Sequence, residues 1–264
     1  MRRNLSGLRA VVTGASRGIG RLTAERLAGQ GCRLVLAARS AAPLHELAAS
    51  LPDAVACPAD LTTDAGRQAV AATAVERFGG LDLLVNNAGV ASWGHFATST
   101  PEILRTVTET NFFAPAELTR VCLPLLAAGT TPAVLNVASL CGKRGLPAWP
   151  EHSGAKAALV GLTEALRGEF ARYGVDVLLV VPGLTRSHDL GRHLLRKDGK
   201  ADLDFEHATP PEEVADAIVA ALRTGRRETL VGRDTRRLVL ANRLAPRFVT
   251  RMISRRVRAL YRAE

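Results

Sequence analysis

The chain has 264 residues, of which 47% are hydrophobic and 23% charged, values that are ordinary for a soluble globular protein. No run approaches the roughly 18 apolar residues that a membrane span needs, and a chain of this length can bury a large core without disulfides or metals. The net charge of +10 is confined largely to the last forty or so residues, so a basic surface over the whole body is excluded.

Strand-like and helix-like segments alternate along the chain, which predicts a parallel sheet with helices on both faces. We expect strands at 9–13, 33–38, 54–57, 81–85, 133–138, 175–181 and 229–232. We expect helices at 18–30, 42–50, 64–78, 101–127 and 153–172, with Pro115 as a kink in the fourth of them. A capping box formed by Thr209 and Glu212 predicts one more helix, which runs to about residue 223.

A glycine-rich turn joins the first expected strand to the first helix, in the order Thr13-Gly14-Ala15-Ser16-Arg17-Gly18-Ile19-Gly20. Glycines there let backbone N–H groups approach a pyrophosphate at the helix N-terminus. Glycines can also simply end a strand, but the strand–turn–helix context favours a nucleotide site. We therefore expect this turn to bind a cofactor through Gly14, Ser16, Arg17, Gly18, Ile19 and Gly20.

The end of the second expected strand indicates which nucleotide binds. NAD sites usually place an acid there to hold the ribose 2′-hydroxyl, but this strand ends in Ala37-Ala38-Arg39-Ser40. Arg39 and Arg17 suit a 2′-phosphate better than they suit the alternative, two solvated arginines in an arginine-rich chain. The pattern predicts NADP(H).

The spacing of the three glycines, Gly-x3-Gly-x-Gly, resembles that of the short-chain dehydrogenase/reductase family, and further family motifs follow in order over residues 8–232. The resemblance implies an α/β fold, a Rossmann-type doubly wound parallel sheet of about seven strands with helices on both faces. It also implies a homo-oligomer. Further cofactor contacts that it implies are Asp60 at the adenine, Asn87, Ala88 and Gly89 along the cleft, and Pro182, Gly183, Thr185 and Ser187 over the nicotinamide.

The family's catalytic tetrad is Asn, Ser, Tyr and Lys, and it transfers hydride between nicotinamide and a carbonyl or alcohol carbon. The resemblance matches Asn111, Ser139 and Lys156, but His152 stands at the tyrosine position. It implies that the serine holds the substrate oxygen, that the lysine also binds the nicotinamide ribose and that the asparagine orders a water. Histidine is a common general acid/base, yet it is shorter than a phenol, and the neighbouring lysine charge favours its neutral form. His152 is either a working acid/base or a filler in an inactive site.

The C-terminal segment is basic and amphipathic. From residue 226 onward there are twelve arginines and three acidic residues, and Leu244, Phe248 and Met252 recur at four-residue spacing beside a row of arginines. This pattern predicts a basic helical tail that binds an anionic membrane surface or packs on this subunit or a dimer mate. Few aromatics are interleaved with the arginines, so we expect no nucleic acid as a partner.

Four cysteines without metal-ligand or CxxC spacing predict reduced thiols and no metal site, and no long apolar stretch marks a signal peptide. A cytoplasmic location follows, peripheral at the inner face of a membrane if the tail binds lipid. We expect residues 1–232 to form one NADP-binding catalytic domain, in which 184–209 is a substrate lid, and 233–264 to form the extension.

Three functions fit these patterns. The first is an NADP(H)-dependent oxidoreductase acting on a small-molecule carbonyl or alcohol. The second is a catalytically impaired NADP-binding protein that serves as a sensor or scaffold, and the third is a protein that interacts with a membrane surface and keeps the fold for stability alone.

Overall fold

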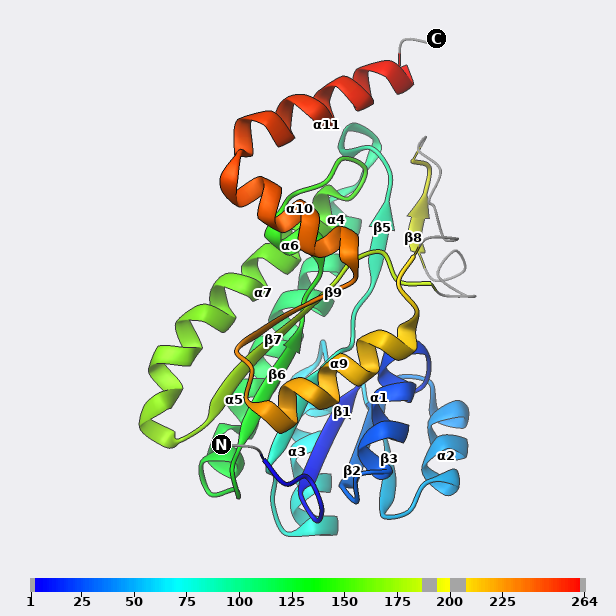
Figure 1. The fold of residues 1–264 in the computed structure, drawn as a ribbon. Helices are drawn as coiled ribbons and strands as arrows, with labels where there is room; N and C mark the ends of the chain where they lie inside the picture. The colour runs from blue at the N-terminus through cyan, green and yellow to red at the C-terminus, as the bar shows by residue number, and fades with distance from the viewer. Residues whose placement is uncertain (1–2, 187–193, 200–207, 262–264) are drawn as a thin grey trace.

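The structure, a computed structural model, describes residues 3–186, 194–199 and 208–261. Seven parallel strands form one sheet in the order β3-β2-β1-β4-β6-β7-β9 (Figure 1). The strands are β1 (Arg9–Thr13), β2 (Arg33–Ala38), β3 (Ala54–Pro58), β4 (Leu83–Asn86), β6 (Ala133–Val137), β7 (Asp176–Pro182) and β9 (Glu228–Val231). Every residue of β4 and β6 is buried, as expected for strands that are covered on both faces.

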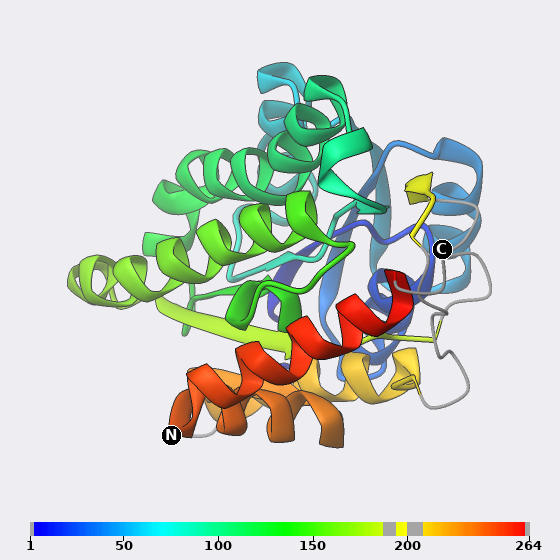
Figure 2. The same ribbon diagram turned by 90° about the horizontal axis from the view of Figure 1, so that it is seen from above.

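Helices cover the two faces of this sheet (Figures 1 and 2). One layer contains α1 (Gly18–Ala28), α2 (Ala41–Ser50) and α9 (Pro211–Thr224), and the other contains α3 (Asp64–Phe78), α5 (Ala114–Ala127) and α7 (Pro150–Glu169). Side chains alternate between the layers: Val12 belongs to the buried cluster that contains Leu27 and Ile218, whereas Val11 belongs to the cluster that contains Val70 and Leu118. The expected α/β doubly wound fold is confirmed.

The strand order reverses between β1 and β4. The chain runs outward from β1 through β2 to β3 and then returns to place β4 on the other side of β1, where Val11 aligns with Val35 and Leu84. In open parallel sheets, ligands bind in the crevice that such a reversal leaves at the carboxyl ends of the strands. The turn after β1 and the segment after β4 therefore form the place to look for a site.

The expected long helix over 101–127 is divided into three parts. These are α4 (Pro101–Thr108), a π-helical segment η2 (Glu109–Phe113) and α5. Pro115 lies in the first turn of α5, just after the wide turn, so the irregularity precedes the proline. The proline ring has no N–H and crowds the carbonyl four residues earlier, which the widened turn accommodates.

The predicted capping box at Thr209 and Glu212 is wrong. The N-cap of α9 is Pro210, and no side chain of the described residues caps it. The backbone of Thr209 is instead engaged with the segment after β7: its N–H donates to the Leu184 carbonyl at 2.9 Å, and its own carbonyl accepts from Arg186 at 2.8 Å. This pairing fixes the start of α9 in place of a side-chain cap.

A small second sheet, which the sequence did not reveal, lies beyond the carboxyl edge of the main one. It pairs β5 (Ala91–Trp93) in parallel with β8 (Leu194–Lys197). The guanidinium of Arg196 fastens this pair by donating to the His95 carbonyl at 2.7 Å. β8 belongs to the expected lid, of which residues 187–193 and 200–207 lie outside the described residues.

The basic tail forms two helices in place of one, α10 (Arg233–Leu244) and α11 (Pro246–Tyr261). They are separated at Ala245, and Pro246 opens α11, where a missing N–H costs nothing. None of the helices in the described part of the chain is long and apolar enough to cross a membrane. All four cysteines are buried and free.

Candidate functional site

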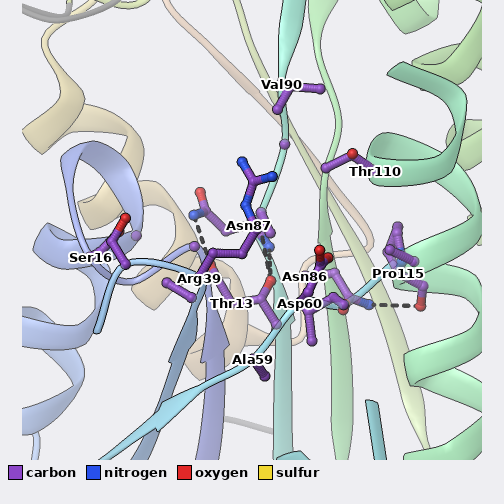
Figure 3. Close-up of a pocket in the computed structure, with 18 of the residues that line it drawn as sticks. Thr13, Ser16, Arg39, Ala59, Asp60, Asn86, Asn87, Val90, Thr110 and Pro115 are labelled. Carbon is purple, nitrogen blue, oxygen red and sulfur yellow. Dashed lines mark hydrogen bonds between the residues drawn. The ribbon is translucent and has the colours of Figure 1, made fainter. Parts of the chain in front are cut away.

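A cavity of about 300 Å³ lies at the carboxyl ends of β1, β2 and β4, and Figure 3 shows part of its lining. It brings together most of the residues expected to bind a cofactor. These are Gly14, Ser16, Arg17, Gly18, Ile19, Gly20, Arg39, Asp60, Asn87, Ala88 and Gly89.

At two positions of the glycine turn, no residue other than glycine fits. Gly14 has φ +67°, and a Cβ there would lie 2.9 Å from the Ala88 Cα. A Cβ at Gly20 would lie 2.1 Å from the Gly14 carbonyl oxygen. The N-cap of α1 is Arg17, and no side chain of the described residues caps this helix. Its first N–H groups, which open on the cavity wall, are therefore available to an anion such as a pyrophosphate.

Hydrogen bonds between the carboxyl ends of β1 and β4 shape the floor of the cavity. The Thr13 hydroxyl accepts from the N–H groups of Asn87 at 2.9 Å and Ala88 at 3.0 Å, and it donates to the Val85 carbonyl at 3.2 Å. The Asn87 side chain returns a hydrogen bond to the Thr13 carbonyl at 2.9 Å (Figure 3). Thr13 was not among the expected site residues, although a polar residue at the end of an apolar run was a usable signal.

Charged residues line the end of the cavity beside β2 and β3. Arg39 directly follows β2 and faces the same cavity as Arg17 and Asp60. The pKa of the Asp60 carboxyl is lowered by hydrogen bonds from the backbone and hydroxyl of Thr62, and further by the charge of Arg39. Asp60 is thus an anion that orders its own loop while it lines the site.

Asn111 and Val90 connect this cavity to the next group of residues. The fully buried Asn111 sits in the π-helical segment, where its Oδ1 accepts from the Val90 N–H at 2.9 Å and its Nδ2 donates to the Val90 carbonyl at 2.8 Å. His152 Nδ1 lies 3.4 Å from the same carbonyl and 3.5 Å from the Asn111 Nδ2. A proton on Nδ1 would be donated to Val90, which leaves Nε2 free to act as a base.

Two titratable side chains follow each other by one turn of α7. Lys156 is buried, its Nζ donates to the Val137 carbonyl at 2.8 Å, and burial lowers its pKa to about 8. The pKa of His152 is lowered to about 4, first by burial and then by the charge of Lys156, while the hydrogen bond to Val90 opposes the shift. The imidazole is therefore neutral at pH 7.

Gly89 joins the two halves of the site. A Cβ at this position would lie 2.8 Å from the Asn111 Oδ1 and 3.7 Å from the Lys156 Nζ. Asn111, His152 and Lys156 thus form one cluster at the end of the cavity. Ser139 is placed beside it through β6: it follows that strand, two residues after the carbonyl that Lys156 binds, and its Oγ accepts from the Cys141 N–H at 3.2 Å.

The expected nicotinamide contacts Pro182, Gly183 and Thr185 do not line this cavity. Pro182 ends β7, and Gly183 and Thr185 follow it, with the Thr185 hydroxyl donating to the Gly183 carbonyl at 3.3 Å. A Cβ at Gly183 would lie 2.5 Å from the Thr235 hydroxyl at the start of α10. Ser187 lies outside the described residues.

Several neighbours of His152 were not anticipated. The centroid of the Trp149 ring lies 6.0 Å from that of His152, and Trp93 lies 6.5 Å beyond Trp149, so an aromatic wall stands next to the imidazole. Glu151 is only 1% exposed, and neither carboxylate oxygen has a hydrogen-bond partner among the described residues. Nothing in the structure explains this buried carboxyl. Val90 takes part through its backbone N–H and carbonyl, so the identity of its side chain in the sequence gives no sign of this role.

The glycine turn, the switch-point cavity and the adjoining polar cluster agree with a family comparison. The sequence model of a family described as short chain dehydrogenase matches residues 9–197. This chain belongs to the short-chain dehydrogenase/reductase family.

Relatives in this family cover nearly the whole chain. The uncharacterized oxidoreductase YxnA of Bacillus subtilis is 34% identical over 254 residues, which span 93% of this chain and 71% of that protein. The ketoacyl reductase HetN of Nostoc is 29% identical over 258 residues, which span 94% of this chain and 88% of that protein. The similarity thus extends beyond the residues that the family model matches.

Solved short-chain dehydrogenase/reductase structures superpose closely. One from Burkholderia phymatum, in complex with NAD, has a TM-score of 0.83 and 25% identity, with 93% of this chain and 96% of that chain covered. One from Burkholderia cenocepacia, in complex with NADP, has a TM-score of 0.81 and 26% identity, with 95% and 99% covered. The neighbours bind either nucleotide, so the choice depends on residues specific to this chain.

Proposed function

We propose that this protein is an NADP(H)-dependent oxidoreductase that transfers a hydride between nicotinamide and a small-molecule carbonyl/alcohol pair, with His152 at the position of the family's tyrosine. One observation carries the proposal: the switch-point cavity ends, at Gly89 and Val90, on a cluster of buried Asn111 and Lys156 and half-buried His152.

The cavity fits a dinucleotide phosphate. Gly14 and Gly20 leave a cradle that a Cβ would fill, and the uncapped start of α1 suits a pyrophosphate. Arg39 and Arg17 line the end where the ribose 2′-substituent would lie, and no acid ends β2 to favour NAD. Two arginines suit a phosphate because guanidinium groups bind it through charge-assisted hydrogen bonds. At the other end, Pro182, Gly183, Thr185 and Ser187 would cover the nicotinamide.

The bound cofactor would accept or supply the hydride. The chain's own residues would handle the proton and the substrate oxygen. His152, neutral and held at Nδ1 by Val90, can take a proton from an alcohol at Nε2. Ser139 would hold the substrate oxygen, Lys156 would bind the ribose, and Asn111 would fix the backbone that orients the imidazole.

One observation favours a second candidate function. An imidazole with a pKa of about 4 carries almost no proton at pH 7, so it could rarely protonate a substrate oxygen and carbonyl reduction would be slow. A protein that binds NADP(H) tightly but turns over little would act as a sensor or scaffold.

We further propose that residues 1–232 form the catalytic unit, with the 233–264 segment as an extension, and that the protein assembles as a homo-oligomer. Leu104 on α4 and Phe113 before α5 are 41% and 47% exposed, which supports a covering partner there.

The test combines binding with turnover. NADPH and NADH are titrated against the protein by nucleotide fluorescence. Turnover is then followed in both directions, as NADPH oxidation over a panel of aldehydes, ketones and quinones and as NADP⁺ reduction over a panel of alcohols. Tight NADPH binding with turnover of at least one substrate is expected. Tight binding without turnover in either direction would favour the sensor or scaffold, and absence of nucleotide binding would contradict both.

A further inference from the structure

The tail helices use only one side to hold themselves on the molecule. On α11, Val249 is 1% exposed, and Ile253 and Val257 are partly buried one and two turns later. The Thr250 hydroxyl accepts a hydrogen bond from Arg144 at 3.0 Å, which fixes α11 to the segment after α6 (Leu140–Lys143). On α10, Thr235 is buried beside Gly183, and Arg236 donates to the Leu230 carbonyl at 3.1 Å. These contacts account for one face.

Beside that face, large apolar side chains stand in the open at the end of α10 and along α11. Leu244 is 75% exposed, Phe248 66% and Met252 48%, which is unusual for such side chains. Arg247, Arg251 and Arg255 are exposed beside them at the same four-residue spacing. We call these six residues the tail face. No acidic residue occurs between Asp234 and Glu264, so the positive charge of the tail face is not balanced within the tail.

We propose that the tail face docks on an anionic membrane surface. A helix with exposed apolar side chains next to unbalanced arginines suits the headgroup region of a bilayer, where the apolar groups enter the acyl boundary and the arginines meet lipid phosphates. A second copy of the chain fits poorly, because twofold pairing would set the same arginines against each other. The proposal is independent of the reaction proposed above.

The placement of the tail gives this docking an orientation. α10 begins directly after β9 and touches the turn after β7, and α11 is tied to the segment after β6. Both views draw α11 at the end of the molecule where these strands finish (Figures 1 and 2). Docking would therefore turn the carboxyl edge of the sheet, and Ser139 with it, toward the bilayer.

The test is co-sedimentation of the full-length protein with phosphatidylcholine vesicles, with and without phosphatidylserine, at low and physiological salt. Retention is expected only on the anionic vesicles and is expected to weaken as salt rises. Replacing Arg247, Arg251 and Arg255 by Gln should lower the partition coefficient on the order of 100-fold, because each basic residue near such a surface contributes about fivefold. The matched control replaces three exposed arginines outside the tail, Arg77, Arg120 and Arg172, by Gln. It should bind anionic vesicles as the wild type does.

A second variant separates insertion from simple attraction. Replacing Leu244, Phe248 and Met252 by Gln keeps the charge and helix propensity, and it should also lower retention on the order of 100-fold or more. Circular dichroism and the NADPH titration check that each variant is folded. The proposal is overturned if wild type is not retained on anionic vesicles at low salt, if the control loses binding as the tail variant does, or if the apolar variant binds normally. Failure on vesicles together with binding to RNA, to an acidic protein or to a second copy would likewise overturn it.

Discussion

His152 differs from a tyrosine in the pH range over which it can accept a proton. Its pKa of about 4 lies far below the ordinary imidazole value of 6.5, whereas a phenol ordinarily loses its proton near pH 10. At neutral pH the histidine is already the base that alcohol oxidation requires, but it lacks the proton that carbonyl reduction requires. We therefore expect His152 to act as a base and not as an acid in the proposed reaction, and the same low pKa makes it a weak base.

The pH dependence of alcohol oxidation follows from this shift. We expect kcat of the wild type to stay level down to about pH 5 and to fall as His152 is protonated near pH 4. As the pH falls, the His152→Tyr variant should lose its oxidation activity at a higher pH than the wild type does, because its phenol must be deprotonated before it can act as a base. The pKa of His152 is about 4 in the folded state and about 6.5 in the unfolded state, so the unfolded chain binds the proton more readily. The free energy of unfolding should therefore also decrease as the pH falls from about 6.5 to 4. The melting temperature must be measured over the same pH range. A wild-type rate that falls near pH 6.5 or above, while the protein stays folded, would contradict the assignment.

The proposed preference for NADP(H) rests on Arg39. The Arg39→Asp variant should lose about 10- to 100-fold in NADPH affinity, the range expected for a lost charge-assisted hydrogen bond, and should gain affinity for NADH. Nucleotide fluorescence titration gives both dissociation constants. Arg120→Asp, on the exposed surface of α5, makes the same charge change away from the cavity and serves as the control. Unchanged NADPH affinity in the Arg39 variant would rule out the 2′-phosphate contact.

At the scale of elements, β1 and β4 are joined at both ends. Their carboxyl ends meet at Thr13 and Asn87, and their amino ends meet at Arg9 and Asp82, whose side chains are 2.7 Å apart. Burial alone would raise the pKa of the Asp82 carboxyl, but hydrogen bonds from Arg9 and Thr130 hold it below its ordinary value. The amino-end pair stabilises the strands on which the site is built without touching the site.

Removing this pair should cost stability and spare binding. Asp82→Ala should lower the free energy of unfolding by about 3 kcal/mol. The Arg9 guanidinium would still be partly removed from water, but it would no longer have a carboxylate to compensate for that loss of hydration. Asp64→Ala removes a carboxylate that is 75% exposed, and should change stability by less than about 1 kcal/mol. Denaturant unfolding measures both. If the Asp82→Ala protein is folded under the assay conditions, its NADPH affinity should match that of the wild type. A folded variant with reduced NADPH affinity would contradict the claim that the Arg9–Asp82 pair contributes to stability but not to nucleotide binding.

The sequence predicted the main elements well and the irregular ones poorly. The seven apolar strand segments and the glycine turn have strong local signals, and α3 begins and ends as expected at residues 64 and 78. β5 and β8 are only three and four residues long and owe their pairing to tertiary contacts such as that of Arg196. The capping box failed because the Thr209 backbone had a tertiary partner that no local pattern shows.

The same limit applies to the candidate site. Side-chain motifs located Gly14, Arg39 and His152, but Val90 acts only through its backbone and could be found only once the fold brought it to Asn111. The burial of His152, the main cause of its low pKa, was also inaccessible to the sequence.

At the scale of the whole molecule, cofactor binding should stabilise the fold. A ligand at a hundredfold excess over its dissociation constant adds about 2.7 kcal/mol to the free energy of unfolding, which for a chain of this size raises the melting temperature by about 5–10 °C. We expect NADPH to produce such a shift and equimolar NADH a smaller one in differential scanning fluorimetry. The Arg39→Asp variant should reverse the order. An equal shift from both nucleotides in the wild type would contradict the proposed preference for NADP(H).

A catalytic role for His152 is tested most directly by comparing turnover of the best substrate pair from the panel by wild type, His152→Ala and His152→Tyr. If His152 is a working acid/base, wild type should exceed the alanine variant by about 10²- to 10⁴-fold, the usual contribution of such a group. If wild type is no faster than the alanine variant while the tyrosine variant is active, the scaffold is competent but His152 takes no part in the reaction. That result would contradict the account and favour a binding role.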